Sequence, residues 1–347
     1  MEPPLPAVAG PLRRRSAPAL KRLLLRTGGF SALRRLAPSR QIAILRYHAI
    51  CGPEGYAYAS PAICVSPAAF EAHARYLAAH YEVLPLPEVV ARLRGGDALP
   101  ANTVAVTFDD GYADNLEAAA ILARHGLTAT FYLTTGSLAG EEPFWPAEVR
   151  QIVTRLPGPT LRLETPTGLA EASLNGASDR EAAIRLVTRL FKSCTIPARE
   201  RMREELRRQA GGGPVTRHML SWEQVAAMQR LGMTIGAHTV THANLPSAGL
   251  DAATTEVTGS KRRLERELGT PVTMFSYPNG GAERYYTPEV QHVVREAGFA
   301  AAVTSRNGFA TRGSDLYALE RIEVREGLEE LGFALEVERF VFAPRRP

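Results

Sequence analysis

Long apolar runs are missing from this chain of 347 residues. A transmembrane helix needs about 20 consecutive apolar residues, and no stretch of that length here is free of charge. An export signal needs a shorter apolar core, but Arg and Lys interrupt every candidate near the N-terminus, and Leu23–Leu25 is far too short. The sequence therefore predicts neither a membrane span nor an export signal, and we expect a cytoplasmic protein.

Cysteine is also scarce, with only Cys51, Cys64 and Cys194. They form no Cys-x-x-Cys pair and their number is odd, so we expect free thiols in a reducing compartment rather than a disulfide framework. Apolar residues make up 45% and charged residues 22% of the chain, which is typical of a soluble globular protein. This composition excludes collagen-like, disordered and coiled-coil chains.

Positive charge is concentrated at one end. Residues 1–40 hold nine Lys or Arg and one Glu, a net charge of +8, whereas the rest of the chain holds 32 basic and 35 acidic residues, a net −3. The pattern over residues 20–36 predicts an amphipathic helix, and such an arm could contact an anionic membrane through residues 12–36. A solvated, partly disordered tail is the alternative. Aromatic residues are scarce in the arm and no nucleic-acid motif is present, so we expect no nucleic-acid partner.

After residue 40, short apolar runs alternate with amphipathic stretches. The predicted strands are 42–45, 103–108, 129–133, 234–237, 273–277, 300–304 and 321–324, and the predicted helices are 67–80, 116–125, 221–231, 256–268 and 288–297. This alternation predicts an α/β fold with a mainly parallel sheet, and about seven strands suggest a complete or incomplete barrel. We expect one domain over residues 41–345, with an insertion on its catalytic face at about 141–220, where the rhythm breaks.

Unusual polar residues follow the predicted strands. In a barrel of parallel strands, active-site residues collect just after the C-terminal ends of the strands. His48, Asp109, Asp110, His238 and Asn279 all occur at such points. We therefore expect their side chains to share one end of the barrel.

Two of these motifs have the composition of a metal site. His238 and His242 are four residues apart, which on one turn of helix places their Cβ atoms about 6 Å from each other. Two histidines and one carboxylate from Asp109–Asp110 leave coordination positions open, as in catalytic sites for zinc or another divalent transition metal. The spare carboxylate can then act as a general base. Taken separately, the motifs are also compatible with a solvated Asp-Asp-Gly turn and two surface histidines.

Together, Thr107–Tyr112 and His238–His242 resemble the motifs of the polysaccharide deacetylase (NodB homology) family, carbohydrate esterase family four. The resemblance spans roughly residues 41–325 and implies a distorted (β/α)7 barrel. It implies Asp109 as the base and Asp110, His238 and His242 as ligands of a divalent metal, zinc in the first place, with cobalt or nickel as alternatives. The pattern is most similar to the branch found in exopolysaccharide and cell-envelope gene clusters.

The sequence departs from the family pattern at two positions. Many members carry an Arg that orients the catalytic Asp where this chain has Ser276, and we expect Arg321 to supply that charge. Many members also have a Leu-x-His motif that provides the general acid, whereas this chain reads Leu-Glu-Arg at 319–321. His48 is the candidate to replace that acid, and its alternative is a structural histidine at the barrel mouth.

Candidate contacts to the sugar surround these motifs. They are Tyr112, Trp222, Tyr277, Pro278 and Asn279. Aromatic rings can stack on sugars, but they also contribute large buried areas to ordinary packing, and the sequence leaves both possibilities open. A backbone N–H near Tyr277 is expected to hold the oxyanion.

The sequence as a whole predicts a metal-dependent hydrolase that removes N-acetyl groups from amino sugars of a polysaccharide or lipid-linked glycan precursor. De-O-acetylation is an alternative, as is hydrolysis of another small amide by an amidase or deformylase. A catalytically silent carbohydrate-binding protein is a third alternative.

Overall fold

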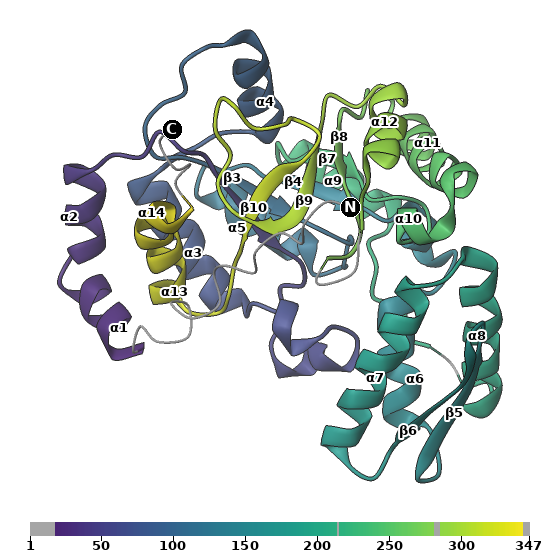
Figure 1. The fold of residues 1–347 in the computed structure, drawn as a ribbon. Coiled ribbons are helices and arrows are strands. Elements are labelled where there is room, and N and C mark those ends of the chain that lie inside the picture. The colour runs from purple at the N-terminus through teal and green to yellow at the C-terminus, as the bar shows by residue number, and fades with distance from the viewer. Residues whose placement is uncertain (1–17, 214, 281–284, 343–347) are drawn as a thin grey trace, which may run out of the picture.

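A computed structural model of the chain describes residues 18–213, 215–280 and 285–342. Seven parallel strands close a barrel (Figure 1). Their order is β1 (Ala43–Tyr47), β10 (Leu319–Glu323), β9 (Ala301–Asn307), β8 (Met274–Ser276), β7 (Thr234–Ala237), β4 (Thr130–Leu133) and β3 (Thr103–Phe108), and β3 pairs back to β1. A short strand, β2 (Glu82–Val83), pairs with the start of β3. The expected (β/α)7 barrel is confirmed.

The two faces of the strands have different tasks. Side chains alternate between faces along a strand, and Ile44, Ala105, Tyr132 and Val303 fill the barrel interior. Their neighbours, which include Leu45, Val106 and Phe131, pack against the surrounding helices. Both faces are buried, so these strands read as continuous apolar runs. The interior is tight: a Cβ at position 236 would lie 2.5 Å from the Tyr132 ring, so only glycine leaves room there.

Five helices around the barrel lie close to where the sequence predicts them. They are α3 (Pro67–His80), α5 (Asn115–Arg124), α9 (Trp222–Arg230), α11 (Leu250–Leu268) and α12 (Pro288–Glu296). A further helix, α4 (Leu86–Gly95), was not predicted. Side-chain caps fix three of the helix starts, because Ser66, Ser221 and Thr287 each accept a backbone N–H from the first turn. α11 begins at Leu250 rather than at the predicted residue 256.

The insertion folds around an apolar cluster of its own. It contains helix α6 (Trp145–Arg155), an antiparallel hairpin of β5 (Thr160–Thr165) and β6 (Gly168–Ser173), and helices α7 (Ala177–Lys192) and α8 (Ile196–Gln209). It projects from one end of the barrel (Figure 1). The hairpin was not expected from the sequence, where residues 141–220 only break the alternation of strands and helices. β5 alternates exposed and buried residues, whereas β6 contains no buried residue.

The N-terminal arm is docked on the C-terminal helices. α1 (Pro18–Arg26) and α2 (Gly29–Leu36) pack against α13 (Leu328–Phe333), the π-helical turn Ala334–Glu338 and α14 (Arg339–Val341). The expected single helix over residues 20–36 is wrong, because the chain breaks at Gly28, which has φ +75°. The first part of the arm, with Arg13–Arg15, lies outside the described residues.

Ion pairs bury part of the basic side of the arm. Lys21 lies 2.6 Å from Glu330, Arg22 lies 3.0 Å from Glu329 and Arg34 lies 3.2 Å from Glu336. Lys21 and Arg34 are buried in these pairs, whereas Arg22, Arg26 and Arg35 are exposed. On the apolar side, Phe30 is buried, but Leu20, Leu23 and Leu36 are exposed. The two faces of the arm are therefore less clearly separated than its sequence pattern predicts.

Two further features bear on the expected location. Among the described residues, no helix is both long and apolar enough to cross a membrane. All three cysteines are free, and the Sγ atoms of Cys51 and Cys64 lie 3.2 Å apart.

Removing the Phe30 side chain tests whether the arm is part of the fold. Phe30 is 2% exposed and its ring packs against Gly332. We expect Phe30→Ala to lower the free energy of unfolding by about 3–5 kcal/mol, as buried Phe→Ala changes do. Leu23→Ala is the control, because Leu23 is 56% exposed, and it should cost less than about 0.5 kcal/mol. Equal effects of the two variants in urea denaturation would show an undocked tail.

Candidate active site

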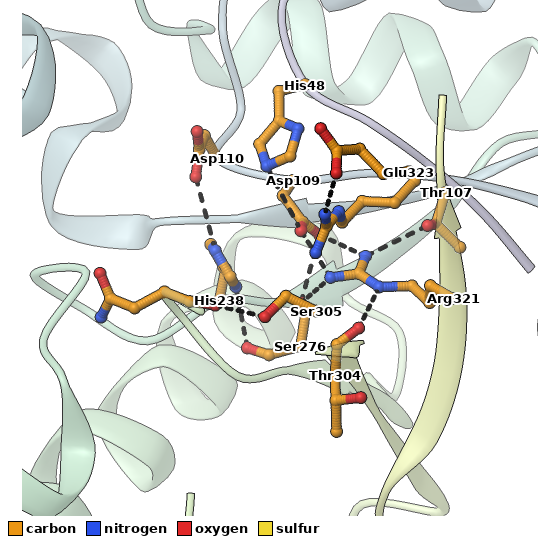
Figure 2. A network of polar contacts seen from close by, with 12 residues as sticks. His48, Thr107, Asp109, Asp110, His238, Ser276, Thr304, Ser305, Arg321 and Glu323 are labelled. Atoms are coloured by element: carbon orange, nitrogen blue, oxygen red, sulfur yellow. Dashed lines mark hydrogen bonds and ion pairs between the residues drawn. The ribbon is translucent and has the colours of Figure 1, made fainter. Parts of the chain in front are cut away.

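A polar layer closes one end of the barrel interior. Thr107, Ser276 and Arg321 each lie two residues beyond an interior apolar residue of the same strand, so their side chains face the same space. Figure 2 shows these residues around Asp109, which follows β3 directly. The strand ends therefore bring together residues that are up to 214 positions apart in the sequence.

The turn after β3 presents two neighbouring carboxylates to this space. Asp110 has φ +77° and Gly111 has φ +93°, both in the left-handed region. The turn is held by hydrogen bonds from the Gly111 N–H to the Asp109 carbonyl and from the Thr134 N–H to the Asp110 carbonyl. Asp109 and Asp110 are 4% and 5% exposed, so the solvated turn that the sequence left open is not what forms.

Asp109 forms a bidentate ion pair with the guanidinium of Arg321. Arg321 donates from Nη1 to Oδ1 at 2.8 Å and from Nη2 to Oδ2 at 2.6 Å, and the Ser276 hydroxyl donates to Oδ1 at 3.2 Å (Figure 2). The Thr304 carbonyl accepts from Arg321 Nε at 2.7 Å and fixes the guanidinium plane. Burial alone would raise the pKa of Asp109, but the charge and hydrogen bonds of Arg321 outweigh it and hold this pKa well below its usual range.

His48 lies beside this pair. Its Nε2 is 3.8 Å from Asp109 Oδ2, which exceeds direct hydrogen-bond distance but is close enough for one small shift or one water to connect them. Burial lowers the pKa of His48, although Asp110 and Asp109 act in the opposite direction. The imidazole is therefore neutral at neutral pH in this structure.

Asp110, His238 and His242 form a donor set for a metal. One possible ligand atom from each lies within 4.8 Å of the others, and all three residues are buried. Nε2 of His238 and of His242 lie 3.5 Å and 3.2 Å from Asp110 Oδ1. His238 Nδ1 is 2.8 Å from the Ser276 carbonyl, and donation there leaves the Nε2 lone pair directed at Asp110. Two imidazoles and one carboxylate fit zinc or a similar divalent metal.

The histidines are on a loop rather than on a helix, so the expected helical turn is wrong. β7 ends at Ala237, and the next residues include Thr239 at φ +65° and His242 at φ +53°. The ring centroids of His238 and His242 are nevertheless 5.0 Å apart. A looped backbone achieves the convergence that the i, i+4 spacing on a helix would give.

The candidate sugar contacts divide into two groups. Tyr112 and Tyr277 are each 1% exposed, and Pro278 is also buried, so these side chains pack in the core in this structure. The Tyr277 N–H itself donates to the Val303 carbonyl, so the backbone N–H expected near Tyr277 for the oxyanion would have to come from another residue. Trp222 and Asn279 are partly exposed, and both amide atoms of Asn279 lack a hydrogen-bond partner among the described residues.

The comparison with protein families decides the relationship. A family model described as polysaccharide deacetylase matches residues 96–155 and 192–302, and the gap between the two matches lies within the insertion. The chain belongs to the polysaccharide deacetylase family. The Bacillus subtilis (strain 168) protein YxkH, whose name assigns it to the polysaccharide deacetylases, is 29% identical over 122 residues. That match covers 35% of this chain and 42% of the relative, so it spans less than half of the relative's length.

Solved structures agree on the fold. The Streptococcus pyogenes deacetylase PplD, solved in complex with acetate, has a TM-score of 0.57 and 22% identity, with 87% of this chain and 100% of that chain covered. IcaB from Ammonifex degensii has a TM-score of 0.55 and 17% identity, with 86% and 99% covered. At these identities the likeness concerns the barrel architecture.

Removing Arg321 tests its pairing with Asp109. We expect Arg321→Ala to lower the free energy of unfolding at pH 7 by about 3–5 kcal/mol, because it leaves a buried charge unpaired. The difference from wild type should narrow between pH 7 and pH 5. Without its cation the buried Asp109 has a raised pKa and takes up a proton there, whereas the lowered pKa of the wild-type group keeps it ionised throughout.

Urea denaturation at both pH values measures this effect. Arg306→Ala is the matched control, because Arg306 is exposed and pairs with Glu320 at the surface. It should change stability by less than about 0.5 kcal/mol at either pH. A pH-independent loss in Arg321→Ala would mean that lost packing, rather than an unpaired Asp109, causes the destabilisation.

Proposed function

We propose that this member of the family is a metal-dependent deacetylase that removes N-acetyl groups from amino sugars of a polysaccharide or lipid-linked glycan precursor. The observation that carries the proposal is the buried Asp110–His238–His242 set beside the Arg321-held carboxylate of Asp109. The acetate in the solved PplD structure is the product expected of such a reaction.

The reaction needs a water, a base and a proton for the leaving nitrogen. Water oxygen attacks the acetyl carbon while Asp109 accepts the water's proton, and the C–N bond then breaks as the nitrogen receives a proton. Acetate and a free amino sugar result. A divalent metal on Asp110, His238 and His242, most suitably zinc, with cobalt or nickel as alternatives, would supply Lewis acidity to polarise the carbonyl and acidify the water.

The pairing with Arg321 suits Asp109 to its part. The carboxylate is ionised over the whole neutral range, so the base is always available. Arg321 and Ser276 also fix its orientation, so no rotamer has to be selected as the substrate binds. The lowered pKa also makes Asp109 a weak base, because the protonated carboxyl readily gives the proton of the water away again.

His48 is proposed to hand the proton to the leaving nitrogen. A neutral imidazole cannot act as an acid by itself, so His48 has to receive a proton first. Asp109 Oδ2, at 3.8 Å from Nε2, is the nearest group that gains one during the reaction. In this scheme Asp109 takes the proton from water and His48 relays it.

Other substrates remain compatible with the same donor set. An O-acetyl ester has a better leaving group, and another small amide would meet the same metal and base. A silent sugar-binding protein would not need the Asp109–Arg321 pair. Trp222 and Asn279 are the proposed sugar contacts, because both are partly exposed and their side-chain polar atoms have no hydrogen-bond partner within the described parts of the chain.

The test combines metal content with acetate release. Purified wild-type protein should carry about one divalent metal per chain by mass spectrometry, and His238→Ala/His242→Ala should lose it. Asp109→Asn should keep the metal and lose at least about a hundredfold in acetate release, the usual contribution of a general base. N-acetylated and O-acetylated glycans assayed side by side identify the bond that is cleaved.

Two results would contradict the proposal. If wild-type protein binds no metal after incubation with zinc, cobalt or nickel, the proposal of a metal-dependent hydrolase is wrong and the sugar-binding protein is favoured. If Asp109→Asn still releases acetate at the wild-type rate, Asp109 is not the general base.

We propose that the arm also contacts an anionic membrane, which would hold the enzyme at the cytoplasmic face close to a lipid-linked substrate. The support is that the basic residues Arg26, Arg35 and Arg40 of the arm are exposed, and that Leu20 and Leu23 of the arm are exposed as well. Lys21 and Arg34 are buried in their ion pairs with glutamates, so the contact would use only part of the arm's charge.

Charge reversal on the arm tests the membrane contact. We expect Arg26→Glu/Arg35→Glu to weaken binding to vesicles containing anionic phospholipid by about tenfold or more, because each basic residue near such a surface contributes about 1 kcal/mol. Arg185→Glu/Arg201→Glu makes the same charge change at exposed positions of the insertion and should have a smaller effect. Equal binding of both variants in vesicle co-sedimentation would refute the contact.

A further inference from the structure

His242 ends a loop whose backbone is held in an unfavourable conformation. Residues with a side chain rarely adopt the positive φ values of Thr239 and His242. Such residues cost about 1–3 kcal/mol each and persist only where their surroundings impose them. The contacts that impose this loop therefore decide where the imidazole of His242 points.

Glu256 of α11 holds one side of the loop. Its Oε2 accepts the N–H groups of Val240 at 2.9 Å and Thr241 at 2.8 Å, and its Oε1 accepts the Thr241 hydroxyl at 2.7 Å. The carboxylate is 4% exposed, and hydrogen bonds to a buried charge are stronger than neutral ones. These bonds fix the backbone directly before His242.

The insertion holds the other side. Arg199 of α8 donates from Nη2 to the Thr241 hydroxyl oxygen at 2.8 Å. Trp145 of α6 donates from Nε1 to the His242 carbonyl at 3.3 Å, and the Arg199 guanidinium lies 5.8 Å from the Trp145 ring centroid. The Thr241 hydroxyl thus joins Arg199 to Glu256, and this chain of contacts connects the insertion to a barrel helix.

Arg199 is buried although it has no buried carboxylate partner within the described insertion. Arg203, one turn further along α8, pairs with the buried Glu148 inside the insertion at 2.6 Å. Arg199 is 2% exposed, yet the carboxylate it contacts is that of Glu200, whose side chain is 39% exposed. A buried guanidinium is costly unless it is paired. Among the described residues, the buried group that accepts a hydrogen bond from Arg199 is the Thr241 hydroxyl in the loop of His242, and this contact offsets part of the cost of burial.

We propose that Arg199 is a positioning residue for His242, through which the insertion serves the metal centre. This inference rests on the proposed metal site. Arg199 holds Thr241 against Glu256, and that turn aims His242 Nε2 at Asp110 Oδ1, 3.2 Å away. Without Arg199 the described insertion residues hold this loop through the longer hydrogen bond from Trp145 to the His242 carbonyl, while Thr241 loses its contact with the insertion, and His242 becomes a less organised ligand.

The experiment compares two buried arginines of the same helix. Arg199→Gln should weaken zinc affinity, measured by competition with a chelator, by about tenfold or more, as loss of contacts behind a metal ligand does. It should also accelerate hydrogen exchange at the Val240 and Thr241 amides in metal-free protein. Arg203→Gln removes a guanidinium of similar burial and should leave both quantities within about twofold. Arg199→Lys, which keeps a donor, should restore part of the affinity.

The outcomes separate this inference from the proposed function. Unchanged zinc affinity and amide exchange in folded Arg199→Gln would overturn the positioning role. Equal losses in Arg199→Gln and Arg203→Gln would overturn it as well, because the insertion would then act only through its own stability. Wild-type protein that binds no metal would refute the proposed function, and the exchange rates of the two variants would still decide whether Arg199 holds the loop.

Discussion

The buried pairing of Asp109 with Arg321 is the interaction on which the rest of the site depends. A carboxylate at the mouth of an apolar barrel is stable only with a cation beside it, and β10 delivers that cation across the interior from β3. The paired Asp109 keeps its charge while Asp110, one residue later, points to the histidines. One turn thereby gives two identical side chains different surroundings and different tasks.

The same pairing constrains the strands around it. Ser276 touches both members of the pair, and its carbonyl also orients His238. Thr304 contributes its carbonyl from β9. The end of the barrel is thus a continuous polar network rather than a set of separate contacts. A shift of β8 would therefore affect both the proposed base Asp109 and the proposed metal ligand His238.

Much of this was accessible from the sequence, and the limits have physical reasons. Apolar runs that end in His48, Asp109 and His238 indicate which residues meet, because parallel strands align their ends. The missing family Arg at Ser276 directed attention to Arg321, and the structure brings it to Asp109 across 212 positions of sequence. A run of apolar residues cannot show which backbone N–H groups a neighbouring strand already uses, so the hydrogen bond from the Tyr277 N–H to the Val303 carbonyl was not predicted.

Contacts made by backbone atoms, and contacts between side chains far apart in the sequence, could not be predicted from the sequence. The carbonyl of Thr304 could belong to any residue, and Glu256 and Arg199 look like ordinary helical charges until the loop of His242 lies between them. The burial of Lys21 and Arg34 was equally hidden, because the glutamates that pair with them come from the last helices of the chain.

That docking has a consequence for the order in which the molecule is completed. Lys21 and Arg34 find their partners 309 and 302 residues later. At synthesis rates of roughly 5–20 residues per second, the arm waits about 15–60 s outside the ribosome before Glu330 and Glu336 emerge. The barrel is open until the same moment, since β1 needs β10 to close it. The first helices to be made are therefore among the last to reach their native positions. The arm docks late in folding and does not contribute to its first steps.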